Sequence, residues 1–281
     1  MPPLNQRQPL VDYLRVQDKT DKEMLRLLRK MDADIDVQLR DLVRKQGVGA
    51  LVRRSQLQGV QREIRGTLAE FYQQTGRVVQ AGRLRAAEAA VSSMFEYADV
   101  LRRAGLSAAE VQVMRRSAEQ TAKVGLQHAM TRYTDSRLPL ARQVYRTNAV
   151  TSGMLDRRIQ SAIGRGLSAR EFATEIKQFV NPRTPGGVRY ASMRLARSEL
   201  NNAFHATTIA TAQDQEWVEG VQWNLSSSHP KPDECDDYAS REPFDPKDVP
   251  KKPHPHCLCY MTFEIMDDAR FAQLVKAGRF D

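Results

Sequence analysis

The side chains with the clearest potential for chemistry lie in one window near the end of the chain. This window holds all three cysteines and three of the five histidines. Thiolate sulfur and neutral imidazole nitrogen are ligands that zinc takes in tetrahedral sites. The pattern therefore predicts a bound metal, which we expect to be zinc in a structural role. The predicted ligands are Cys235, His254, Cys257 and Cys259, with His229 in reserve.

Other interpretations of these residues remain open. The cysteines could be buried thiols and the histidines solvated imidazoles that share a hairpin without a metal. A disulfide is disfavoured, because three cysteines leave one unpaired and the N-terminus lacks the apolar core of a secretion signal. If replacing His254 left the metal bound, His229 or His256 would have to supply the fourth ligand. Residues 257 and 259 would point both sulfurs to one face of an extended segment.

A wider motif surrounds these ligands. Trp223 opens the run W-N-L-S-S-S-H, Cys235 follows in a proline-rich loop, and P-H-P-x-C-x-C closes the motif at Cys259. Upstream stands an Arg-Ser-Glu run that begins at Arg197. This arrangement resembles the Mu F-like head morphogenesis family of tailed phages, over about residues 140–265. Many members of that family carry a second cysteine shortly after the first, whereas Asp236 follows Cys235 here, so His229 would substitute.

The resemblance implies a minor head protein of a tailed phage, a structural part and not an enzyme. Such a protein is associated with the portal or the procapsid interior and acts in head morphogenesis and in DNA packaging or delivery. Its implied partners are the portal protein, packaged double-stranded DNA bound without sequence preference, and scaffold or major capsid protein. It would be made in the bacterial cytoplasm and found in the virion. In this setting we expect Arg194 and Arg197 to face DNA or the portal, and Trp223, Glu199 and Asn202 to support the metal loop.

The charge of the chain is unevenly placed. Residues 1–220 hold 35 Lys and Arg against 23 Asp and Glu, while residues 221–281 hold 8 against 11. A basic body suits a polyanion or an acidic protein surface, although solvated basic helix faces explain the same numbers equally well. No apolar run approaches the length of a membrane span, which predicts a soluble protein without a membrane partner.

The predicted elements give a mainly α fold. Residues 1–19, polar and containing three prolines, are predicted to form a flexible arm. Residues 20–138 are predicted to form a body of long antiparallel helices, with separate helical patterns at 60–78 and 84–101. Residues 139–281 are predicted to form the head morphogenesis domain, including a long helix over about 188–215. Capping boxes predict helix starts at Thr20/Glu23, Ser107/Glu110 and Ser168/Glu171.

The end of the chain is predicted to be a small α+β module. Alternating apolar and polar residues at 221–225 and 257–265 predict two strands that pair as an antiparallel hairpin. Seven prolines in residues 229–255 argue against a helix there, and residues 267–280 have a helical pattern. We therefore expect the Cys/His loop at 229–259 to staple the hairpin onto the long helix. A polar stripe on that helix, Arg194, Arg197, Asn201 and His205, would lie under the loop or form a surface stripe.

A different class of function is a zinc-dependent hydrolase or nuclease that uses the same loop. A catalytic zinc keeps an open coordination position and needs a nearby general base. Four neighbouring carboxylates could supply one: Asp233, Glu234, Asp236 and Asp237. Sites rich in thiolate are more often structural, and the chain carries no H-E-x-x-H, deaminase or phosphate-loop motif, so the structural interpretation is favoured.

Overall fold

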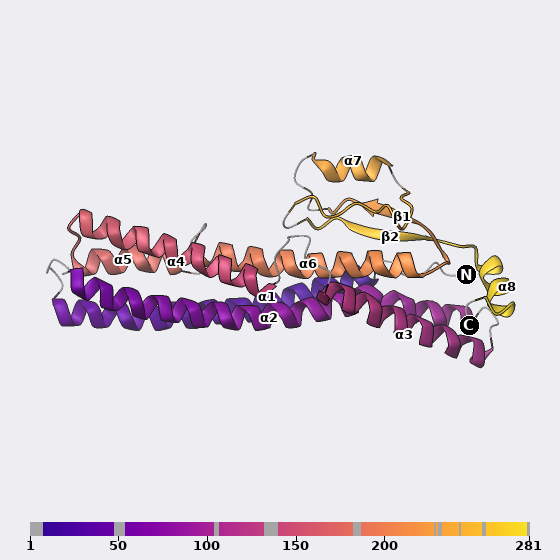
Figure 1. The fold of residues 1–281 in the computed structure, drawn as a ribbon, viewed down its shortest axis with the longest axis horizontal. Coiled ribbons are helices and arrows are strands. Elements are labelled where there is room, and N and C mark those ends of the chain that lie inside the picture. Colours follow the sequence, from indigo (N-terminus) through magenta and orange to yellow (C-terminus); the bar gives the residue numbers. More distant parts are fainter. Residues whose placement is uncertain are drawn as a thin grey trace. The chain divides into compact units, whose positions relative to one another are not determined.

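The computed structural model describes residues 8–47, 54–103, 107–131, 140–181, 187–227, 229, 232–241, 243–254 and 257–279. Within them the chain is mostly helical, with one small antiparallel sheet near its end (Figure 1). This confirms the predicted fold class. The elements are α1 (Gln8–Gln46), α2 (Arg54–Arg103), α3 (Ala108–Thr131), α4 (Leu140–Gly164), α5 (Ala169–Val180), α6 (Val188–Asp214), β1 (Val218–Asn224), α7 (Glu234–Arg241), β2 (Tyr260–Ile265) and α8 (Asp268–Lys276). None of the described helices combines the length and apolar character needed to cross a bilayer.

Contacts divide the chain into two compact units that do not follow chain order. The first comprises residues 1–18, 81–136 and 197–281, and the second comprises residues 19–80 and 137–196. Helices α1, α2 and α6 each contribute residues to both units. The predicted boundary between residues 138 and 139 lies outside the described residues, and the compact units differ from the contiguous domains expected. Long helices explain the difference, because each packs against different neighbours at its two ends.

The predicted N-terminal arm is wrong for residues 8–19, which form the first turns of α1. Pro9 is the second residue of this helix, where its missing N–H removes no intrahelical hydrogen bond. The predicted capping box at Thr20 is also wrong, because Thr20 lies inside α1 and is only 1% exposed. Residues 1–7 lie outside the described part of the chain.

The second unit is a helical layer built on matching apolar stripes. Helix α1 buries apolar residues that recur at helical spacing: Met24, Leu28, Met31, Ile35, Leu39 and Leu42. Helix α2 runs antiparallel to it, since Gln38 donates to Thr67 and Lys30 pairs with Glu70. The two patterns predicted as separate helices form one helix of 50 residues, because nothing between residues 78 and 84 interrupts it.

Helix ends follow local sequence signals closely. Ser107 and Glu110 exchange backbone–side-chain hydrogen bonds of 2.7 and 3.3 Å, and Ser168 and Glu171 form the same reciprocal box. Both predicted boxes are therefore confirmed. Helix α1 ends before Gly47, whose φ of 85° lies in the left-handed region that suits glycine.

The end of the chain forms the module that positions the cysteines. Strands β1 and β2 pair antiparallel with Trp223 opposite Met261, as predicted. Figure 1 shows this hairpin between the C-terminal half of α6 and the short helix α7. Gly220 allows a close approach here, because a Cβ would lie 2.9 Å from Glu264 Oε2 and 3.2 Å from Pro243 Cβ, and both neighbours would have to shift.

Two details of this module were not predicted. The proline-rich loop contains α7, which was excluded because of its prolines, yet residues 234–241 hold none. The prolines instead flank the helix and limit its length. Cys257 and Cys259 precede β2, which begins at Tyr260, so they are not part of the strand as expected.

Candidate metal centre

Three buried thiols meet in the C-terminal module. Cys235 comes from the start of α7, and Cys257 and Cys259 come from the segment that leads into β2. Each is at most 3% exposed, and all three are free. Their sulfur atoms lie within 4.8 Å of one another, so together they could hold a metal ion. The sequence prediction that these three cysteines converge is therefore confirmed.

The distances between these groups fit a tetrahedral ion. Zinc bonds of about 2.3 Å to sulfur and about 2.0 Å to nitrogen give tetrahedral edges of about 3.5–3.8 Å. The sulfurs of Cys235 and Cys257 are 3.5 Å apart, and Cys235 Sγ lies 3.8 Å from His254 Nε2. Cys259 Sγ lies 4.0 Å from His229 Nδ1. The three thiols could therefore hold a metal ion, with His229 and His254 nearby as candidates for a further ligand.

Two histidines compete for the fourth position. His229 presents Nδ1 toward Cys259, while its Nε2 lies 2.9 Å from a carboxylate oxygen of Asp236. A carboxylate on the far nitrogen of a ligating histidine fixes its tautomer and ring orientation. His254 instead places the same nitrogen, Nε2, 3.1 Å from Asp233 and 3.8 Å from Cys235. The side chain of His229 is less exposed, at 11% against 37%, whereas His254 lies nearer to its thiol, at 3.8 against 4.0 Å, so both histidines are placed to supply the fourth ligand. His256 lies outside the described residues.

Burial favours the neutral form of two of the three thiols. Desolvation raises the pKa of Cys235, and the neighbouring thiols add to the shift. Desolvation also raises the pKa of Cys259. The raised pKa values of Cys235 and Cys259 favour the protonated thiols until a cation is bound. A divalent ion supplies that charge, and its binding releases the thiol protons.

Lys252 provides a positive charge at the same centre and was not predicted. Its ammonium lies 3.8 Å from Cys257 Sγ, donates to the carbonyl oxygen of Cys259, and sits 5.3 Å from the ring centre of Trp223. Burial lowers the pKa of Lys252, and the charge of the neighbouring cysteines opposes that shift. A zinc ion with three thiolates and one neutral imidazole carries one net negative charge, which Lys252 would offset. Nothing in the sequence distinguishes this lysine from Lys251.

Helix α6 supports the centre through two residues of its polar stripe, which agrees with the first of the two placements that the sequence left open. The Asn201 side-chain amide donates to the carbonyl oxygen of Cys257, and His205 Nε2 lies 3.1 Å from the carbonyl oxygen of Pro250. Both side chains are buried. Burial holds the pKa of His205 well below its usual value, and the charge of Lys252 lowers it further, so its ring is neutral. Its Nε2 therefore donates to Pro250.

Trp223 occupies the middle of the module's core, as expected of a supporting residue. It is 2% exposed, and its ring meets those of His205 and Tyr238 edge to face at 5.5 and 5.1 Å. Aromatic pairs in this geometry contribute beyond their buried area. Trp223 thus joins α6, β1 and α7 beside the thiols.

The other predicted residues of α6 lie elsewhere. Glu199 is buried against Arg83 of α2, with Nε and Oε2 3.7 Å apart, so it supports the helix pair and not the metal loop. Asn201 takes the role expected of Asn202, because it is the residue that faces the loop. Arg194 is exposed, and Arg197 is half-buried and makes contacts within the protein.

The carboxylates near the thiols bind backbone and histidine groups. Asp233 accepts from the backbone N–H of Cys235 at 2.8 Å, and Asp236 accepts from the backbone N–H of Asp233 at 2.8 Å. These hydrogen bonds lower the pKa values of both carboxyl groups. A general base suited to neutral pH needs a raised pKa. Glu234 and Asp237 are exposed on α7.

The choice between the histidines can be measured. We expect His229→Ala to weaken zinc binding more than His254→Ala, because His229 is the more buried ring and is oriented by Asp236. Asp236→Asn should weaken zinc binding by about 10- to 100-fold, the usual effect of losing such a partner. Competition with a chromogenic chelator gives the affinities, with Asp237→Asn as the control. A larger loss for His254→Ala would assign the fourth position to His254.

Comparison with known proteins adds no relative. A scan against protein-family models and searches of curated proteins and of solved structures find no match to this chain.

Proposed function

We propose that the chain is a minor head protein of a tailed phage and that its C-terminal module is held together by a structural zinc. The motif from Trp223 to Cys259 and its resemblance to the Mu F-like head morphogenesis family motivate the head assignment. In this role the protein is associated with the portal or the procapsid interior and is found in the virion. Its partners are the portal protein, packaged DNA, and scaffold or major capsid protein.

The observation that carries the structural role is the convergence of Cys235, Cys257 and Cys259 in a buried cluster. The ion would join α7 to the segment that precedes β2, and Asn201 ties that same segment to α6. A hairpin of two short strands is marginal by itself in water. A metal that links its neighbours therefore contributes folding free energy directly.

Several features argue against a hydrolase or nuclease. Three thiolates and one imidazole fill a tetrahedral zinc and leave no position for a reacting water. The nearest carboxylates have lowered pKa values because they accept backbone hydrogen bonds, which suits positioning and not proton abstraction. The thiols themselves are buried. We therefore assign the metal to structure and propose no reaction.

An infectivity test separates the two classes. A phage carrying Asp236→Asn, or Asp237→Asn as the control, is expected to assemble heads that contain this protein once zinc occupancy is confirmed. Cys259→Ser should give heads that lack the protein or fail to assemble, because the module no longer folds. An enzyme would give the opposite pattern, in which Asp236→Asn abolishes function in a folded, zinc-loaded protein. That pattern would overturn the structural assignment.

A further inference from the structure

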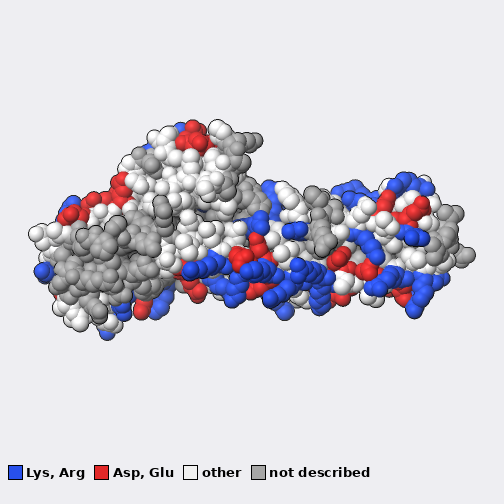
Figure 2. Space-filling model, turned by 180° about the vertical axis from the view of Figure 1, so that it is seen from behind, with Lys and Arg blue, Asp and Glu red and all other residues white. Residues whose placement is uncertain are grey.

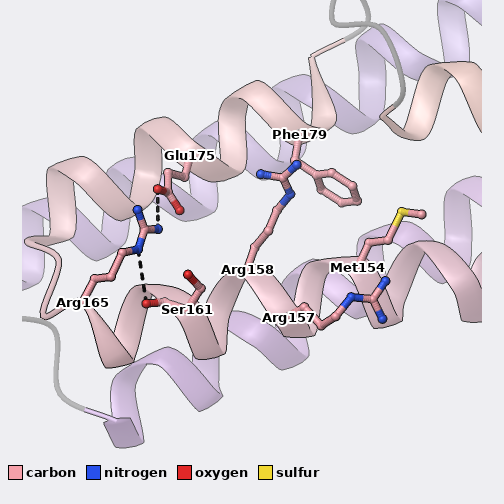
Figure 3. Close-up of a pocket in the computed structure, with 7 residues that line it drawn as sticks. All are labelled: Met154, Arg157, Arg158, Ser161, Arg165, Glu175 and Phe179. Atoms are coloured by element: carbon pink, nitrogen blue, oxygen red, sulfur yellow. Dashed lines mark hydrogen bonds and ion pairs between the residues drawn. The ribbon is translucent and has the colours of Figure 1, made fainter.

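A hollow between α4 and α5 gathers three arginines that the metal centre does not use. It has a volume of about 500 Å³ and is lined by Met154, Arg157, Arg158, Ser161, Arg165, Glu175 and Phe179. Figure 3 shows Arg158 reaching from α4 toward Phe179 of α5, and Arg157 extending along α4 beside Met154. The guanidinium carbon of Arg158 lies 5.1 Å from the centre of the Phe179 ring. All these residues belong to the second compact unit.

The charges of this region do not balance. Residues 137–196 hold 11 Lys and Arg against 3 Asp and Glu, so nearly all the net charge of the chain, +9, falls in this segment. Figure 2 shows acidic side chains among the basic ones over much of the visible face. The overall charge therefore does not identify a basic site. An arginine contributes to such a site only if no nearby carboxylate pairs with it.

Each of the three carboxylates in α4 and α5 already has a partner. Asp156 accepts from Gln61 at 2.6 Å and from Arg65 Nε at 3.1 Å, both on α2. Glu171 accepts from Ser168 in the capping box, and Glu175 pairs with Arg165. Among the residues that the structure describes, no carboxylate pairs with Arg157 or Arg158. Both are exposed, so the hollow presents two uncompensated guanidinium groups to solvent.

The basic residues continue along α4 beyond the hollow. Arg146 and Arg157 are eleven residues apart, which places them on the same side of the helix and about 16 Å apart along its axis. Arg142 lies one turn before Arg146 and extends this line to about 22 Å. Arg157 lies back along α4 in this direction, since its NH1 atom is 3.8 Å from the position that a Cβ of Gly153 would take. All three arginines are exposed.

We propose that this arginine line, Arg142, Arg146 and Arg157, together with Arg158 in the adjoining hollow, binds phosphates of a DNA backbone. Guanidinium groups match the oxygens of a phosphate in a bidentate manner. A line of separate charges over about four turns of α4 fits a polymer of regularly spaced anions better than a single acidic side chain. Backbone contacts of this kind carry no sequence information. The inference rests on the proposed head function, in which packaged DNA is the available polyanion, and it moves the DNA contact from Arg194 and Arg197 to α4.

The test is duplex binding followed by fluorescence anisotropy. Wild-type protein and a labelled duplex of mixed sequence, about 30 base pairs long, are titrated from 50 to 300 mM NaCl. We expect similar affinity for unrelated duplexes and a steep fall with salt. Arg157→Ala/Arg158→Ala should weaken binding by about tenfold or more at low salt and reduce the salt slope by about two. The control is Arg26→Ala/Arg62→Ala, which removes the same charge from exposed positions on α1 and α2 and should leave the slope unchanged.

Three outcomes would overturn the proposal. They are no duplex binding by the wild type at 50 mM NaCl, equal loss in the control, or no loss in the double variant. Polyglutamate serves as a competitor: if it binds through the same arginines while the duplex does not bind, the site takes an acidic protein surface instead. Circular dichroism and zinc content are recorded for every sample. If the folded, zinc-loaded protein does not bind DNA, the proposed DNA contact is wrong. The head assignment is tested separately by the infectivity experiment.

Discussion

Replacing Cys257 with serine is expected to release the metal and unfold the C-terminal module while the long helices persist. Cys257 is 1% exposed, and its sulfur lies 3.5 Å from that of Cys235. Serine cannot replace a thiolate ligand of zinc, and the free energy of structural zinc binding is folding free energy. The remaining thiols would then be buried without the cation that holds them together.

The chain offers a direct measurement of this effect. Both of its tryptophans, Trp217 and Trp223, are buried in the C-terminal module. Their fluorescence therefore reports on the module alone, whereas circular dichroism at 222 nm is dominated by the long helices. For Cys257→Ser we expect red-shifted tryptophan emission with a nearly unchanged helical signal. Glu234→Gln on the surface of α7 is the control and should behave as the wild type. A Cys257→Ser protein with native emission would show that the module does not depend on the metal.

Replacing Glu199 with alanine should be the most destabilising change away from the metal centre. The Glu199 and Arg83 side chains are only 5% and 7% exposed and lie 3.7 Å apart. Removal of one partner of a buried ion pair leaves an uncompensated charge and costs about 3–5 kcal/mol. We expect that loss of unfolding free energy in urea titrations followed at 222 nm.

A double variant distinguishes the cost of leaving one buried charge unpaired from the net contribution of the ion pair to stability. Arg83→Leu/Glu199→Leu replaces both charges with apolar groups of similar length, and such replacements are often neutral or stabilising. We therefore expect the double variant to be more stable than Glu199→Ala alone. If Glu199→Ala loses less than about 1 kcal/mol, the carboxylate is not the partner that Arg83 requires.

Local signals in the sequence predicted the local structure well. The boxes at Ser107 and Ser168 mark helix starts because each satisfies two backbone donors that the helix leaves free. The same pattern at Thr20 failed, since a helix already in progress satisfies those donors itself. The threonine is instead buried inside α1. Apolar spacing identified the helical segments at 60–78 and 84–101 but could not show that they form one continuous helix, because the end of a helix depends on what packs beyond it.

The composition of the metal centre was predictable, but its arrangement was only partly so. Three cysteines and the nearby histidines identify a thiolate-rich site from residue type alone. The choice between His229 and His254 depends on Asp236, which reaches His229 only because α7 forms in the loop. That helix was not predicted, because the many prolines in residues 229–255 argued against it. The i, i+4 pair of Asn201 and His205 indicated which face of the helix could lie beneath the loop. The position of Lys252 beside the thiols could not be predicted from the sequence and follows only from the fold.

The central claim is that a closed zinc site holds the C-terminal module together, and X-ray absorption at the zinc edge tests it most directly. Purified protein should contain about one zinc per chain, with about three sulfur neighbours near 2.3 Å and one nitrogen near 2.0 Å. This four-coordinate shell leaves no place for a reacting water. Protein without zinc, or zinc that keeps a water in its coordination shell, would contradict this account.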